Sequence, residues 1–109
     1  MSDQVAEGRA ALELALEIVE AHANALWKEK ACDLVNWIAH EKSEFTTDEV
    51  WEALERFYPS LSTHEPRAMG AVMRSASRSG IIVPTDRTTK TIRPLAHRRP
   101  VRVWSSLVY

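Results

Sequence analysis

The sequence predicts an α+β fold, mostly α, in which a long N-terminal helix precedes two short helices and a two-stranded β-hairpin. Residues 2–41 hold no proline and no glycine after Gly8, and they are rich in Ala, Leu and Glu, which favour helices. Two short amphipathic segments follow, and two β-rich runs come after them. The chain of 109 residues is long enough for one domain with its own core.

Charge is divided unevenly along the chain. The formal net charge of the whole chain is −1 at pH 7. Residues 1–61 contain five Lys and Arg against thirteen Asp and Glu, a net charge of −8, whereas residues 62–109 contain nine against two, a net charge of +7. Only the second half therefore suits a polyanionic partner such as nucleic acid.

The long N-terminal segment is expected to form one helix, or two abutting helices that meet near residues 22–25, where Asn24 weakens helix propensity. Its first part has a heptad-like apolar strip, called strip one, and a second strip beside it, called strip two. Strip one consists of Val5, Leu12, Leu16, Val19, Ala23 and Leu26, and strip two of Leu14, Ile18, Ala21 and Ala25.

This apolar surface is wider than one helix of a small domain normally buries. We therefore expect residues 1–26 to be a dimerisation segment that forms a homodimer, since most soluble oligomers are two-fold dimers. Burial of both strips inside a monomer is the alternative. The expected dimer contacts are Val5, Leu12, Leu16, Val19 and Leu26.

A winged helix-turn-helix domain is expected over residues 27–109, and its first helix has an ordinary core stripe. That stripe consists of Trp27, Ala31, Leu34, Val35 and Ile38. Cys32 lies in the same apolar pattern, so we interpret it as a small buried hydrophobe rather than a reactive thiol. A single cysteine also excludes an internal disulfide.

The second helix is expected to begin at a capping box formed by Thr46 and Glu49. It ends at about residue 57 or 58, because Pro59 cannot continue a helix and disfavours a helical conformation in the residue before it. Its expected buried face contains Val50, Leu54 and Phe57, with Trp51 and Tyr58 beside them.

The third helix is expected between a cap at Ser62 or Thr63 and a stop at Gly80, a natural left-handed C-terminal cap. At about 100° per residue, its apolar and basic residues fall on opposite faces. The apolar face contains Met69, Val72, Met73 and Ala76, and the basic face contains Arg67, Arg74 and Arg78. This is the geometry of a DNA recognition helix.

Two short strands are expected after this helix, at residues 81–83 and 100–104. The connection at residues 85–99 is longer than a usual hairpin loop and is rich in Arg and Thr. Two strands after a helix-turn-helix make a winged helix-turn-helix with a hairpin wing. Trp104 is interpreted as a core residue of this hairpin, with a base-stacking platform as the alternative.

Two motifs in this half also resemble a known group of proteins. Residues 63–74 (THEPRAMGAVMR) together with residues 99–104 (RPVRVW) are similar to the ending of small helix-turn-helix proteins of actinobacteriophages, the mycobacteriophage type in particular. The resemblance covers the C-terminal half. It implies a winged helix-turn-helix fold and DNA binding, in a phage transcriptional regulator or replication accessory.

The expected partner is double-stranded DNA. An arginine can form two hydrogen bonds to one guanine edge, while the helix start and the basic loop can hold phosphates. The alternative is that these arginines only solvate an exposed face. The expected DNA contacts are Thr63, His64, Arg67, Arg74, Ser75, Arg78, Arg87, Lys90, Arg93, Arg98, Arg99 and Arg102.

A protein-interaction module or host-protein inhibitor is the alternative function, because a fold does not fix a function and the N-terminal half is apolar and acidic. No metal-ligand spacing, catalytic constellation or glycine-rich phosphate loop occurs in the sequence. We therefore expect no enzyme activity, cofactor, metal or membrane partner. The first residues do not resemble a signal peptide, so we expect a cytoplasmic protein, in the bacterial host cytoplasm if phage-encoded.

Overall fold

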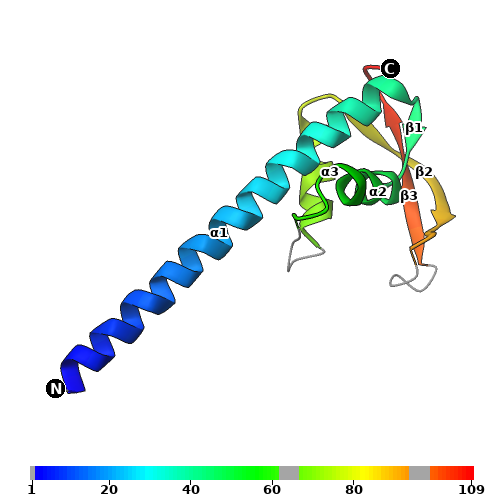
Figure 1. Cartoon of the computed structure of the whole chain (residues 1–109). Coiled ribbons are helices and arrows are strands. Elements are labelled where there is room, and N and C mark those ends of the chain that lie inside the picture. The colour runs from blue at the N-terminus through cyan, green and yellow to red at the C-terminus, as the bar shows by residue number, and fades with distance from the viewer. Residues whose placement is uncertain (1, 62–66, 94–98) are drawn as a thin grey trace.

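Figure 1 shows the computed structural model of the chain, which describes residues 2–61, 67–93 and 99–109. For residues 2–14, 16–21 and 23 it describes the backbone alone. The predicted α+β class is confirmed, with three helices and one antiparallel sheet in the described ranges. The elements are α1 (Ser2–Glu41), β1 (Glu44–Phe45), α2 (Thr47–Phe57), α3 (Ala68–Arg78), β2 (Ile82–Lys90) and β3 (Pro100–Ser106).

Helix α1 is one unbroken helix of 40 residues, so the alternative of two abutting helices is wrong. Its N-terminal half projects away from the other elements, and the longest dimension of the chain is 63 Å. Its C-terminal half is the centre of the domain. The predicted core stripe is confirmed, because Trp27, Ala31, Leu34, Val35 and Ile38 are all buried.

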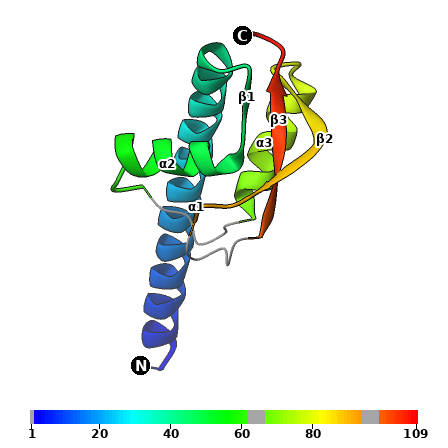
Figure 2. The same cartoon turned by 90° about the vertical axis from the view of Figure 1, so that its right-hand side faces the viewer.

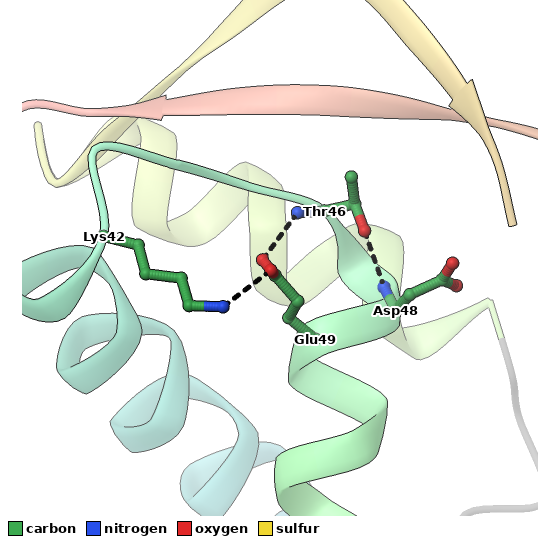
Figure 3. A network of polar contacts seen from close by, with 4 residues as sticks. All are labelled: Lys42, Thr46, Asp48 and Glu49. Carbon is green, nitrogen blue, oxygen red and sulfur yellow. Dashed lines mark hydrogen bonds and ion pairs between the residues drawn. The ribbon is translucent and has the colours of Figure 1, made fainter. Parts of the chain in front are cut away.

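Helix α2 begins at the predicted capping box, which Figure 3 shows from close by. The backbone amide of Thr46 donates to Oε2 of Glu49 at 3.2 Å, and Oγ1 of Thr46 accepts from the amide of Asp48 at 3.2 Å. Nζ of Lys42 donates to Oε1 of Glu49 at 2.8 Å, which raises the pKa of Lys42. The cap therefore also ties the start of α2 to the end of α1.

The predicted buried face of α2 is correct for Val50 and Leu54 and wrong for Phe57. Phe57 is the last residue of the helix and is 49% exposed, because α1 covers only one side of it. Its ring meets Trp37 of α1 edge to face, with the ring centres 5.8 Å apart. Trp51 was expected beside the buried face of α2, and it is half-buried against Trp27.

Helix α3 buries the predicted apolar face, because Met69, Val72, Met73 and Ala76 are all buried. The predicted stop is also confirmed. Gly80 has a φ of +77°, a left-handed conformation that glycine adopts without the clash of a Cβ. The expected caps Ser62 and Thr63 lie outside the described residues, and the described helix begins at Ala68.

The prediction of a two-stranded hairpin is wrong in the number of strands. A third strand, β1, pairs with β3 through Glu44 opposite Ser105 and Phe45 opposite Trp104, which gives the sheet order β1-β3-β2. Two residues are too few to show an alternating pattern in a sequence. The pairing instead depends on Phe45, whose side chain is buried in the core beside the half-buried Trp104.

Strand β2 is also longer than predicted and reaches Lys90, so residues 85–90 lie in a strand and not in a loop. The ladder runs from Ile82 opposite Ser106 to Lys90 opposite Pro100, with a register shift between Pro84 and Thr88. Threonine is β-branched and favours extended backbone, which explains why this Thr-rich segment continues the strand.

The end of the hairpin is fixed to α2 by a buried carboxylate. Asp48 in the first turn of α2 is 6% exposed. Its Oδ1 accepts from the hydroxyl of Thr91 at 2.7 Å, and its Oδ2 accepts from the backbone amide of Ile92 at 2.9 Å. The negative charge also lies at the positive end of the α2 dipole. Asp48 therefore connects two segments more than 40 positions apart.

Replacing Asp48 by Ala is expected to lower the free energy of unfolding by about 1 to 3 kcal/mol, because the buried Thr91 hydroxyl and the Ile92 amide lose their acceptor. Urea unfolding measures the change. Asp86→Ala is the matched control, since Asp86 is an exposed aspartate of β2. Equal unfolding midpoints for the two variants would show that Asp48 does not hold the hairpin.

Candidate nucleic-acid interface

The outer face of α3 is basic and exposed. Arg74, Ser75 and Arg78 are exposed, and so is Arg67 immediately before the helix. The described helix contains no acidic residue. These side chains lie opposite the buried methionines, as the helical period predicted. The predicted recognition face is therefore free of contacts with the core.

Gly70 gives the side chain of Arg74 its place on this face. Long side chains in a helix lean toward the N-terminus, over the residue one turn earlier. A Cβ added at Gly70 would lie 3.4 Å from Nη1 of Arg74, a tight contact. The guanidinium group of Arg74 thus lies over Gly70, one turn earlier in the helix.

The hairpin contributes a second set of exposed basic residues. Lys90 and Arg102 are on one face of the hairpin. Arg102 lies opposite Thr88, and Thr88 is two residues before Lys90 in the same strand, so the three side chains share a face. The side chains of Lys90 and Arg102 are exposed, as is Arg99. The backbone carbonyl of Arg99 accepts from the amide of Thr91 at 2.9 Å, which closes this end of the ladder.

Figures 1 and 2 show where these two sets lie in the domain. In both views the beginning of α3 and the far end of the hairpin lie in the lower part of the domain, and α3 runs from there toward its upper part. Figure 2 shows that α2 crosses α1, whereas α3 lies to one side of it. The hairpin end also meets α2, because Thr91 bonds to Asp48 and Arg93 to Glu55 of that helix.

Arg87, a predicted DNA contact, forms an ion pair with an acidic residue of the sheet. Its Nη2 lies 2.6 Å from Oε1 of Glu44 on β1. The Arg87 hydrogen bond holds the pKa of Glu44 below its ordinary value, and Glu44 raises that of Arg87. Both side chains are exposed, so this surface ion pair can open toward a stronger anion.

Arg93 has a structural environment that its sequence position did not reveal. Its Nη1 lies 2.9 Å from Oε1 of Glu55, and its guanidinium carbon lies 4.8 Å from the ring centre of Trp51. Only 27% of its side chain is exposed. Arg93 is therefore packed on α2 and does not belong to the exposed basic set.

Three predicted contacts, Thr63, His64 and Arg98, lie outside the described residues. In the predicted dimerisation segment, the side chains of Val5, Leu12, Leu16 and Val19 also lie outside the description. The exposed basic set among the described residues consists of Arg67, Arg74, Arg78, Lys90, Arg99 and Arg102, with Ser75 also exposed on α3.

An apolar pocket between α1 and α2 was not predicted as a site. It has a volume of about 180 Å³ and lies between the half-exposed rings of Trp37 and Phe57, with Ile38 and Ala53 among its lining residues. Lys42, Glu49, Glu52 and Arg56 complete the lining. The position of Trp37 off the core stripe of α1 was the only sequence signal for this pocket.

The described residues offer little for other chemistry. No three of their His, Cys, Asp and Glu side chains gather into a group that could hold a metal ion. Cys32 is half-buried, and burial raises the pKa of its thiol, so it is a poor nucleophile at neutral pH. None of the helices described is long and apolar enough to cross a membrane.

Replacing Arg93 by Ala is expected to lower the free energy of unfolding by about 1 kcal/mol, because its side chain covers Trp51 and pairs with Glu55. Lys90→Ala removes the same charge from an exposed position and should change stability by less than about 0.5 kcal/mol. Thermal unfolding of the two variants measures the difference. If the Lys90 variant is the less stable one, the packing assigned to Arg93 is wrong.

Comparison with protein families, with curated proteins and with solved structures finds no match to this chain. A functional assignment therefore depends on the chain's own geometry and charge.

Proposed function

We propose that this protein is a winged-helix DNA-binding protein that acts as a homodimer, of the type of a phage transcriptional regulator or replication accessory. The order of elements supports this fold, because a helix, a short strand, two helices and a two-stranded hairpin follow one another. The short strand completes a three-stranded sheet with β3 in the middle. In this fold α3 is the recognition helix and the end of the hairpin is the wing.

The observation that supports DNA binding most strongly is the basic outer face of α3, which has no acidic residue, together with the exposed basic residues of the hairpin. In both views the beginning of α3 and the far end of the hairpin lie in the lower part of the domain. Because duplex DNA is a dense line of negative charge, such a surface binds phosphates and releases their counterions.

Helix α3 has the right size for a DNA groove. Its 11 residues make it about 16 Å long, and an α-helix fits into the major groove of B-DNA. Arg74 and Arg78 are one turn apart on the exposed face, so each can reach a guanine edge or a phosphate. Arg67 lies where the chain enters the helix and is positioned for the backbone of one strand.

The wing extends the contact along the duplex. Lys90 and Arg102 share one face of the hairpin, and Arg99 follows at its end. Such side chains neutralise phosphates or enter a narrow minor groove. Because Asp48 and Arg93 fix this end of the hairpin to α2, the wing keeps a defined position relative to α3.

Helix α1 supplies the homodimer in this proposal. Leu26, the last residue of strip one, is 36% exposed, whereas the next residue, Trp27, is 2% exposed. The domain at residues 27–109 thus leaves Leu26, the end of strip one, uncovered at its boundary with residues 1–26. A second copy of the segment would cover it and would bring two recognition helices to one DNA molecule.

A second candidate function is a protein-interaction module, and the pocket between Trp37 and Phe57 favours it. Half-exposed aromatic rings beside a pocket are typical of sites that anchor a partner's side chain. The volume of about 180 Å³ is below the range of about 300 to 1,000 Å³ that is usual for small-molecule sites. A host protein with an exposed apolar residue would suit this surface.

The variant Arg74→Ala with Arg78→Ala is expected to bind duplex DNA at least about tenfold more weakly while keeping its circular dichroism spectrum, because both side chains lie outside the core. If both contact phosphates, the slope of log affinity against log salt should also become shallower by about 2. Fluorescence anisotropy with a random-sequence duplex measures both quantities.

The matched control is Lys42→Ala with Arg56→Ala, which removes the same charge from the end of α1 and from α2, outside the exposed basic set. It should leave affinity nearly unchanged. Equal loss in both double variants would mean that net charge alone governs binding. Absence of wild-type binding at about 50 mM salt would overturn the proposed function and favour the protein-interaction module.

A further inference from the structure

Ala71 lies in the middle of the exposed basic face of α3. We propose that Ala71 is the residue of α3 that comes closest to the bases of bound DNA, and that its small side chain sets how deeply the helix enters the groove. The role assigned to Ala71 rests on the proposed DNA binding and does not depend on the homodimer.

Four residues form one line along the exposed side of α3, called the arginine line. They are Arg67, Ala71, Arg74 and Arg78, spaced by four, three and four positions. At about 100° per residue they fall within a sector of about 60°, whose centre is opposite the buried apolar face of the helix. Arg67 precedes the helix but has helical backbone angles, so it continues the line. The three arginines are exposed, and Ala71 between them is half-buried.

The residues on either side of the arginine line are small. Gly70 and Ser77 lie on one side of it, and Ala68 and Ser75 lie on the other. On the outer side of α3, only the arginines are therefore longer than serine. A surface that approaches this side meets either a long arginine, which can lean aside, or the helix backbone where it is least covered.

The position of Arg74 leaves Ala71 open. A Cβ added at Gly70 would lie 3.4 Å from Nη1 of Arg74. Around the helix, Gly70 and Ala71 lie on opposite sides of Arg74. The guanidinium group that leans over Gly70 therefore leans away from Ala71. The middle of the arginine line thus offers a methyl group that the Arg74 side chain does not cover.

Close approach matters because there is little spare room in the groove. The major groove is about 12 Å wide and an α-helix with its side chains is about 10 to 12 Å across. An arginine reaches a guanine edge only at donor–acceptor distances of about 2.7 to 3.2 Å. A larger side chain at position 71 would meet the floor of the groove first and hold Arg74 and Arg78 away from it. Ala71 is therefore a positioning residue for the arginine contacts.

The test compares variants at position 71 by fluorescence anisotropy, with the duplex that the wild-type protein selects from a random-sequence pool. Ala71→Leu and Ala71→Lys are expected to bind this duplex at least about tenfold more weakly, because the arginines lose their base contacts. Leucine and lysine favour helices, so the thermal unfolding midpoint should stay that of the wild type. Ala71→Ser keeps a small side chain and should bind within about twofold of the wild type.

Ser79→Lys is the matched control for the added charge. Ser79 is exposed at the C-terminal end of α3 and lies outside the arginine line, so a lysine there should leave the affinity unchanged or raise it. If α3 only attracted phosphates from outside the groove, Ala71→Lys would raise the affinity in the same way.

Wild-type affinity in Ala71→Leu, or tighter binding by Ala71→Lys, would overturn the role of Ala71 while leaving DNA binding intact. A loss in Ala71→Ser as large as that in Ala71→Leu would also overturn it, because the size of the side chain would not be the cause. Absence of wild-type binding to the random-sequence duplex would instead overturn the proposed function itself.

Discussion

The change of apolar face in α1 at Trp27 is the constraint on which the rest of the structure depends. After this residue, one side of the helix is the floor of the core, and α2, α3 and the sheet all pack on it. Before it, the same side of the helix carries Glu13, Glu17 and Glu20, and most of the large apolar residues lie on other sides. One continuous helix therefore serves two purposes. It organises a small domain, and its N-terminal half projects away from the other elements.

The basic surface follows from how the domain packs on that helix. Burial of Met69, Val72 and Met73 turns the arginines of α3 outward. The hairpin is held near them because its end is fixed to α2 by Asp48, while β3 is joined to the rest of the core through β1. Two basic residues of the hairpin region, Arg87 and Arg93, form ion pairs within the fold. The other described basic residues of the hairpin, Lys90, Arg99 and Arg102, are exposed.

Features that depend on local pattern were predictable from the sequence. Each of these features is set by residues a few positions apart in the sequence. They are the core stripe of α1, the capping box of α2 and the opposed faces of α3. Gly80 marks the end of a helix because glycine readily adopts a left-handed backbone conformation. Strand β1 was missed because its pairing depends on residues 60 positions away.

The candidate site was predictable to the same extent. The exposure of Arg74 and Arg78 follows from the helical period, but the burial of Arg93 against Trp51 and Glu55 is a contact between distant segments.

The most direct test of the account is to map backbone amide chemical shifts while a short duplex DNA is added. The largest changes are expected in α3 and at the far end of the hairpin, with α2 unaffected. Changes centred on α2 and the pocket at Trp37, or none at all, would contradict it.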